Sequence, residues 1–198
     1  SGTNGKTTVT SLTGQLLQRA GKSVAVAGNI GPTLLDTLQT CLDTEALPDV
    51  WALELSSFQL DEVTSFEPSV ATVLNISQDH LDWHGSMAAY VRAKSAIYGL
   101  TGVMLLNRDD PQVMAAVPAL VKGKQLRKVL TFGGDVPQRP GDYGIETVNG
   151  MTWLVRAAEA DETIKRRRDE EIPVYVQRLI PVAYTHPTSP TIPLLQTP

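Results

Sequence analysis

The chain has 198 residues, 42% of them hydrophobic, and a formal net charge of −4 at pH 7. This length and hydrophobic content suffice for one domain with a hydrophobic core and part of another. The charge gives no sign of a nucleic-acid-binding surface, no apolar run reaches membrane-spanning length, and the one cysteine, Cys41, excludes a disulfide framework within the chain. We therefore expect a cytoplasmic monomer with no nucleic-acid partner and no membrane insertion.

The chain opens with a phosphate-binding loop, Gly2-Thr3-Asn4-Gly5-Lys6-Thr7-Thr8, which we call the phosphate loop. Its glycines allow backbone N–H groups to face phosphate oxygens, Lys6 supplies a mobile charge for the β- and γ-phosphates, and Thr7 offers a hydroxyl to Mg²⁺. The alternative is an ordinary glycine turn, but Gly-Lys-Thr at the start of an amphipathic helix favours ATP binding. The full pattern needs a glycine before Ser1, so we expect a fragment that begins inside the motif.

Strands and helices alternate along the first two-thirds of the chain. Apolar spacing predicts a helix from Lys6 to Ala20, a short strand at Ser23–Ala27 and a helix from Pro32 to Leu42. Further strands are expected at Val50–Leu55, Val70–Ile76, Val103–Asn107 and Lys128–Phe132, with helices at about 58–65, 86–98 and 111–121. This alternation predicts an α/β fold with a mostly parallel sheet and helices on both faces. Ligands of such sheets bind at the carboxyl ends of the strands.

The pattern changes after Gly133. The strand-like segments Tyr143–Val148 and Thr152–Arg156 flank Asn149-Gly150, which predicts a small antiparallel extension. From Leu179 to Pro198 there is no Asp, Glu, Lys or Arg, and five of the 13 prolines lie there, a spacing that supports neither a helix nor a central strand. The segment could be a proline-rich ligand, but we favour a sequence that leaves its native reading frame near residue 181. We therefore expect one domain over residues 1–181 and a non-native or disordered tail over 182–198.

A carboxylate stands near the end of a hydrophobic strand in the run Trp51–Leu60. An ionised Glu54 is costly there unless it is paired or faces a cation. In phosphate-loop enzymes an acidic residue at this position holds Mg²⁺; the alternative is a helix cap or a structural ion pair. Ser56, Ser57 and Gln59 follow at a helix start, where their side chains can cap the helix or contact a substrate.

Two histidines and two aspartates occur within the six residues from Asp79 to His84, directly after a predicted strand. Such a group can hold a metal, although hydrophilic loops often carry the same residues. The absence of cysteine ligands argues against a structural zinc. With a phosphate loop in the same chain, we interpret the group as a Mg²⁺ site that uses His80.

Lys94 lies where a core residue is expected, because it shares one helical face with Met87, Tyr90 and Ile97. A buried lysine has a lowered pKa and retains some neutral amine, which can react with CO₂ to give a carbamate, a carboxylate-like metal ligand. The alternative is that the stem is buried while the ammonium group reaches water. Periodicity alone favours this second interpretation.

Together these segments resemble the Mur ligase family, the ATP-dependent amide-forming ligases of peptidoglycan synthesis. The matching stretches are Gly2–Thr8, Gly28–Gly31, Glu54–Leu60, Asp79–Asp82 and the helix that carries Lys94. Sister ligases and folylpolyglutamate synthase share the phosphate loop, but Glu-Leu-Ser-Ser-Phe-Gln-Leu is most similar to the family branch that adds D-glutamate to UDP-N-acetylmuramoyl-L-alanine. The resemblance covers about residues 1–180 and implies the central ATPase domain of a three-domain enzyme, inactive without its flanking domains.

The resemblance implies a reaction in two steps. The carboxylate of the muramoyl-L-alanine substrate attacks the γ-phosphate of ATP to give an acyl phosphate, and the amine of D-glutamate then displaces phosphate. Two Mg²⁺ ions are implied, one held by Thr7 and Glu54, the other near His80 and carbamylated Lys94. Asp79 is expected to orient His80. The expected catalytic residues are Lys6, Asn29, His80 and Lys94, and the expected substrate contacts are Asn29, Ser56, Ser57 and Gln59.

Rival functions stay open. The chain could belong to another Mur-type ligase or to folylpolyglutamate synthase, to a phosphate-loop kinase or hydrolase, or to a nucleotide-binding module without catalysis. Glu54, His80 and Lys94 together argue against the last of these, since simple ATP binding does not require all three.

Overall fold

The computed structural model describes residues 1–119, 127–160 and 173–182. The chain divides into two compact units, Ser1–Thr131 and Phe132–Pro198. Among the described residues, no helix has both the length and the apolar character needed to cross a bilayer.

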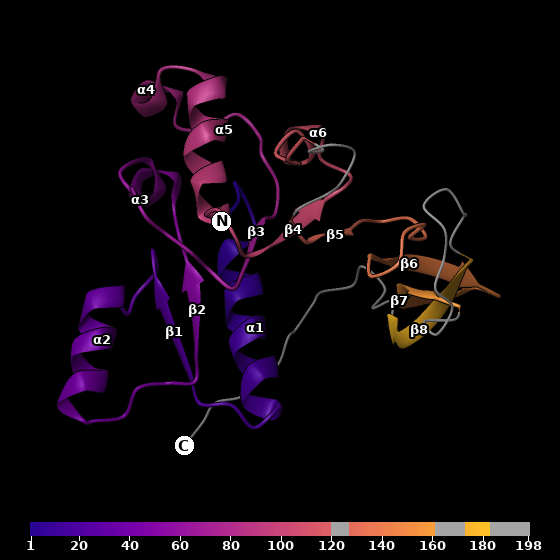
Figure 1. Ribbon diagram of the computed structural model, residues 1–198, viewed down its shortest axis with the longest axis horizontal. Helices are drawn as coiled ribbons and strands as arrows, with labels where there is room; N and C mark the ends of the chain where they lie inside the picture. Colours follow the sequence, from indigo (N-terminus) through magenta and orange to yellow (C-terminus); the bar gives the residue numbers. More distant parts are fainter. Residues whose placement is uncertain (120–126, 161–172, 183–198) are drawn as a thin grey trace, which may run out of the picture. The chain divides into compact units, whose positions relative to one another are not determined.

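The first strand pair of the N-terminal unit is formed by β1 (Val24–Gly28) and β2 (Val50–Glu54), which run parallel. Helices α1 (Lys6–Arg19) and α2 (Leu34–Asp43) lie on either side of this pair (Figure 1). Gly28 lies opposite Glu54 with a φ of +132°, and a Cβ there would stand 2.0 Å from the carbonyl oxygen of Glu54. Only glycine allows this close approach at the end of the strand pair that carries the carboxylate.

A second group of strands follows in the same unit. β3 (Val70–Val73) and β4 (Val103–Asn107) run parallel, and β5 (Val129–Phe132) pairs with β4. Helix α5 (Met87–Ser95) and the 3₁₀ turn Ala96–Tyr98 bury their apolar residues against β3 and β4. These residues belong to a cluster of buried hydrophobic side chains that forms a core of the unit. Burying one large side chain of this kind stabilises the fold by about 1.5–3 kcal/mol.

The first three residues of the chain lie alongside β3. The amino group of Ser1 donates to the Thr72 carbonyl, and the Leu74 N–H donates to the Ser1 carbonyl, both at 2.9 Å. The Thr3 N–H donates to the Asn75 carbonyl at 3.0 Å. This pairing fixes the start of the phosphate loop beside the segment that follows β3.

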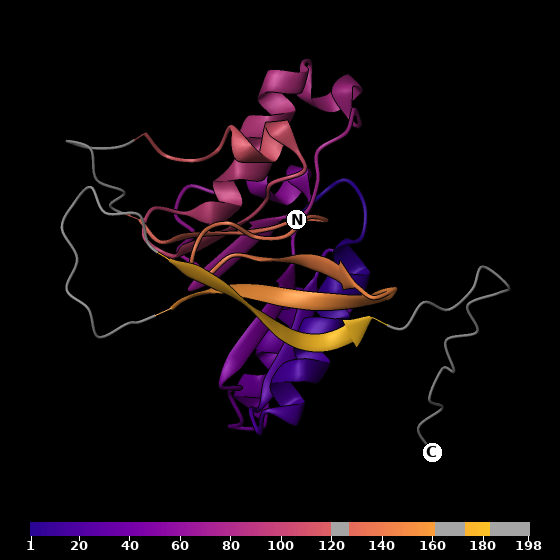
Figure 2. The same ribbon diagram turned by 90° about the vertical axis from the view of Figure 1, so that its right-hand side faces the viewer.

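The C-terminal unit contains an antiparallel sheet of β6 (Tyr143–Val148), β7 (Met151–Glu159) and β8 (Val174–Val182), in that order (Figure 2). Asn149 and Gly150 make the turn between β6 and β7 with φ values of +51° and +77°, so the predicted hairpin is confirmed. β8 is an edge strand, and this explains why it accepts Pro181, which has no N–H to donate.

The observed elements depart from the predicted ones in several places. The parallel strands are hydrogen-bonded as two groups, β1–β2 and β3–β4–β5, and not as one continuous sheet. The helices predicted over 58–65 and 111–121 are only α3 (Ser57–Asp61) and α6 (Pro111–Met114), since turn-forming residues and Pro118 follow them. Helix α4 (Leu81–His84) and strand β8 were not predicted. Of the non-native or disordered tail expected over 182–198, Val182 is instead the last residue of β8, and residues 183–198 lie outside the described residues.

Candidate active site

Segments from four parts of the N-terminal unit meet around a cavity of about 90 Å³. They are the phosphate loop, the residue after β1, the start of α3, and the segment from the end of β3 into α5. The predicted site residues that line the cavity are Gly2, Thr3, Lys6, Asn29, Ser56, Ser57, Asp79, His80 and Lys94. Phe58 and Tyr90 complete the wall, and our site prediction did not include either of them.

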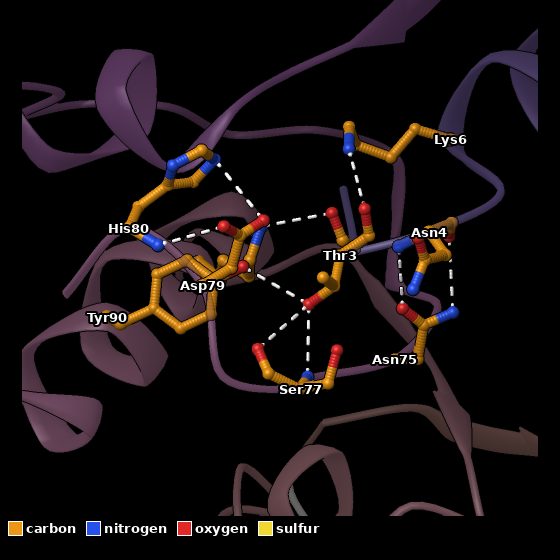
Figure 3. A network of polar contacts seen from close by, with 10 residues as sticks. Thr3, Asn4, Lys6, Asn75, Ser77, Asp79, His80 and Tyr90 are labelled. Atoms are coloured by element: carbon orange, nitrogen blue, oxygen red, sulfur yellow. Dashed lines mark hydrogen bonds and ion pairs between the residues drawn. The ribbon is translucent and has the colours of Figure 1, made fainter.

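A reciprocal pair of hydrogen bonds joins the phosphate loop to the segment that follows β3 (Figure 3). The Asn4 N–H donates to Asn75 Oδ1 at 2.8 Å, and Asn75 Nδ2 donates to the Asn4 carbonyl at 3.1 Å. Gly5 then begins α1 with a φ of +78°, and the first turn of the helix contains no acidic residue. The positive end of α1 is therefore left for an anion, as expected for a phosphate site.

Glu54 is a buried carboxylate, with only 4% of its surface exposed. Thr7 Oγ1 donates to its Oε2 at 2.9 Å, and Asn29 Nδ2 donates to its Oε1 at 3.3 Å. Both donors are neutral, and no lysine or arginine in the described ranges forms an ion pair with Glu54. Because burial of an uncompensated charge is costly, and because hydroxyl, carboxylate and amide oxygens suit Mg²⁺, these residues fit a divalent cation.

The two site lysines are held by consecutive carbonyls of the phosphate loop. Lys94 Nζ donates to the Gly2 carbonyl at 3.0 Å, and Lys6 Nζ donates to the Thr3 carbonyl at 3.1 Å. Lys94 is only 2% exposed, so the interpretation that its ammonium group reaches water is wrong. Burial first, and the charge of Lys6 second, lower the pKa of Lys94 from 10.5 to about 8, while Asp79 opposes the shift.

His80 begins α4 in a left-handed conformation, with a φ of +51°, and turns its ring toward Asp79. His80 Nε2 lies 3.4 Å from Asp79 Oδ2, and the His80 N–H donates to Asp79 Oδ1 at 3.0 Å. The ring of Phe58 supports the imidazole from 4.7 Å between centroids. Within the described part of the chain, no three Cys, His, Asp or Glu side chains are grouped to hold a metal.

The serines at the start of α3 differ in what they contact. The Ser56 N–H donates to Gln59 Oε1 at 2.9 Å, and the Gln59 N–H donates to Ser56 Oγ at 3.3 Å, so these two side chains form a capping box. Ser57 is only 1% exposed, lines the cavity, and its Oγ has no hydrogen-bond partner. Buried hydroxyls are normally satisfied, and Ser57 Oγ shares its lack of a partner with Ser1 Oγ, Thr72 Oγ1 and His84 Nε2.

Two aromatic side chains of the site were missed for different reasons. Tyr90 lies one helical turn before Lys94, so its shared face was visible in the sequence, although its hydroxyl contact with Thr3 was not. Phe58 was predicted only as part of a helix. Its ring contacts with His80, His84 and Trp83, of which only the one with His84 is stacked, depend on α4, which has only four residues.

Comparison with known proteins agrees with this geometry. The Mur ligase middle domain model matches residues 1–149. A UDP-N-acetylmuramoylalanine–D-glutamate ligase of Polaromonas sp. strain JS666 is 67% identical over 185 residues, which cover 91% of this chain and 32% of that protein. A protein of the same name from Burkholderia multivorans is 53% identical over 188 residues, 91% of this chain and 37% of the relative. The chain thus spans about a third of the length of these relatives.

Solved structures show the same fold. The structure of a UDP-N-acetylmuramoyl-L-alanyl-D-glutamate–2,6-diaminopimelate ligase matches with a TM-score of 0.56 at 26% identity, over 79% of this chain and 36% of that one. A crystal structure of MurF from Acinetobacter baumannii matches with a TM-score of 0.50 at 21% identity, over 78% and 34% of the two chains. With its phosphate loop, its buried strand-end glutamate and a match of residues 1–149 to the Mur ligase middle domain, the chain belongs to the Mur ligase family.

Proposed function

We propose that the full-length protein containing this chain adds D-glutamate to UDP-N-acetylmuramoyl-L-alanine, with ATP as the energy source. The observation that carries the proposal is one cavity bordered by the phosphate loop, Lys94 and the segment around Glu54, in a chain 67% identical to a D-glutamate ligase. The names of the relatives support the choice of D-glutamate over the amines of sister ligases. The activity belongs to the whole protein, of which this chain supplies the ATP site.

The chain's own residues have to gather several anions, namely the substrate carboxylate and the β- and γ-phosphates. Lys6 lies at the mouth of α1 and reaches the phosphates by leaving the Thr3 carbonyl. Asn29 lies against Glu54 at the cavity wall, where its amide can also contact the transferring phosphate. The hydroxyl of Ser57, which has no partner in the described residues and lines the cavity, would donate to the substrate carboxylate. Such donors act most strongly where they are buried and arranged before the reaction, as Ser57 is.

Two cation positions complete the proposal. Thr7 and Glu54 would hold one Mg²⁺, and His80 with carbamylated Lys94 would border the second. When bound, Mg²⁺ supplies positive charge that screens the phosphates and orients them for attack. Asp79 holds the ring of His80 in place for this role.

The activity itself is tested with the full-length protein, ATP, UDP-N-acetylmuramoyl-L-alanine and radiolabelled D-glutamate. We expect a D-glutamyl product and one ADP for each product formed. Hydroxylamine added without D-glutamate should trap the acyl phosphate as a hydroxamate. Transfer of phosphate to a hydroxyl acceptor, with no hydroxamate, would instead support the kinase or hydrolase reading.

The first metal position predicts a charge effect at Glu54. Glu54→Gln keeps the side-chain shape but removes the carboxylate charge, so activity should fall and the Mg²⁺ concentration for half-maximal rate should rise by about tenfold or more. Glu62→Gln removes an exposed charge at the end of α3 and should leave the Mg²⁺ titration unchanged. Identical titration curves for Glu54→Gln and the wild type would place the metal elsewhere.

Ser57 predicts opposite effects on stability and activity. Ser57→Ala removes a buried hydroxyl that has no partner, so the free energy of unfolding should stay the same or rise by about 1 kcal/mol. The KM for the muramoyl substrate should rise about fivefold, because a ligand contact is lost. Ser11→Ala, at an exposed position of α1, controls for the substitution itself. If Ser57→Ala lowers stability without changing KM, the hydroxyl has a structural role and does not bind substrate.

A further inference from the structure

Tyr90 of α5 connects the phosphate loop with Lys94. The residue is fully buried at 0% exposure and lines the cavity. Its hydroxyl lies 3.1 Å from Thr3 Oγ1 (Figure 3). Lys94 Nζ lies 4.7 Å from the centre of its ring. We propose that Tyr90 is a positioning residue of the ligase, which places the phosphate loop through its hydroxyl and, before the carbamate forms, places the Lys94 ammonium group through its ring. This inference rests on the proposed function.

The hydrogen bonds around Thr3 assign the direction of the Tyr90 contact. A threonine hydroxyl has one proton and two lone pairs. Thr3 Oγ1 donates to the Ser77 carbonyl at 3.2 Å and accepts from the Ser77 N–H at 3.0 Å. One lone pair of Thr3 Oγ1 remains, so the Tyr90 hydroxyl donates to it, and the threonine hydroxyl then has all its hydrogen bonds. Burial raises the pKa of Tyr90, and the phenol therefore keeps the proton that it donates.

The position of Thr3 determines where both lysines are held. The Thr3 carbonyl accepts from Lys6, and the Gly2 carbonyl accepts from Lys94. In the uncarbamylated state, the ring of Tyr90 also attracts the ammonium group of Lys94 from a second side, within the range of cation–π contacts. Small displacements of groups that position a substrate have large effects on rate, so loosening Thr3 should affect the use of ATP.

Tyr98 offers a matched control for Tyr90. It lies in the 3₁₀ turn after α5, it is 3% exposed, and its hydroxyl accepts a hydrogen bond from the Val73 N–H at 3.2 Å. It does not line the cavity. Tyr98→Phe and Tyr90→Phe thus each remove one buried tyrosine hydroxyl and its hydrogen bond while keeping the ring. Only Tyr90→Phe removes a hydrogen bond to the phosphate loop.

The experiment compares the two variants in the full-length ligase. For Tyr90→Phe we expect kcat/KM for ATP to fall about five- to tenfold and the affinity for ATP, measured by calorimetry, to fall several-fold. The KM for D-glutamate should stay within about twofold, because the loop contacts the nucleotide and not the amine. Tyr98→Phe should change all these values by less than about twofold, with a comparable fall in Tm.

A double-mutant cycle separates the hydrogen bond from general loosening of the core. If Tyr90 acts through Thr3, the double variant Thr3→Val with Tyr90→Phe should lose no more kcat/KM for ATP than Thr3→Val alone. Losses that multiply, or equal losses in Tyr90→Phe and Tyr98→Phe, would overturn the inference. A wild-type protein that forms no D-glutamyl product would refute the proposed function. The calorimetric affinities of the two tyrosine variants would then still decide whether Tyr90 positions the loop.

Discussion

Lys6→Ala in the full-length ligase is expected to lower kcat about a hundred- to a thousandfold, the usual effect of losing a preorganised contact to developing charge. The reason is that Lys6 is the cation at the mouth of α1, where the γ-phosphate has to be stabilised as it is transferred. In the described state its ammonium group contacts the Thr3 carbonyl and needs only a rotation of its own side chain to reach a phosphate. Steady-state release of ADP in the presence of both substrates measures the effect.

The matched control is Lys22→Ala, which removes the same charge from an exposed position after the far end of α1. This variant should keep the wild-type rate, and both variants should keep the wild-type Tm, since neither lysine side chain is part of the hydrophobic core. A Lys6→Ala enzyme that retains more than about a tenth of wild-type kcat would show that Lys6 does not stabilise the transferring phosphate.

Lys94→Ala is expected to be nearly inactive and to regain activity with short carboxylic acids. Truncation opens a buried space beside the Gly2 carbonyl, and a small acid entering it would restore the carboxylate that we propose the carbamate provides. Formate and acetate should therefore raise the rate in a saturable manner. Methylamine and ethylamine, which restore a cation, should not. Rescue by the amines alone would show that Lys94 works as an ammonium group.

The lowered pKa supports formation of this carbamate near neutral pH. Because the pKa of Lys94 is about 8, roughly one side chain in ten carries a neutral amine at pH 7, against about one in three thousand for an unperturbed lysine. Burial disfavours the charged form of a lysine, so the fraction of Lys94 in the neutral, CO₂-reactive form increases as the pH rises through 8. Wild-type enzyme in CO₂-free buffer should lose activity and regain it on addition of bicarbonate.

The parts of the site that could be predicted from the sequence are those fixed by local rules. A glycine-rich turn before a helix and a carboxylate at the end of an apolar strand can both be recognised along the chain, and Lys6, Thr7 and Glu54 are found where these rules put them. The buried state of Lys94 was different, because periodicity describes a face of the helix but not what covers it. Its cover is the Gly2 backbone and the Tyr90 ring, which come from packing between distant segments.

The sequence likewise predicted some features of the fold and not others. The order of the strands follows from their apolar runs, but a run of hydrophobic residues carries no information about which strand pairs with which. The grouping into β1–β2 and β3–β4–β5 was therefore missed. β8 was missed because prolines flank and enter it, and proline argues against a strand except at an edge, where β8 lies.

The two hydrogen bonds between Asn4 and Asn75 couple the phosphate loop to the segment that leads to His80. Both hydrogen bonds use backbone atoms of the phosphate loop, so a nucleotide that moves the loop pulls on Asn75, five residues before the imidazole. A shift of the loop is thereby passed to the segment that carries His80 at the cavity wall. Thermodynamic linkage makes such coupling mutual: whatever affinity a ligand at the phosphate loop adds for a ligand beside His80, the second ligand adds for the first.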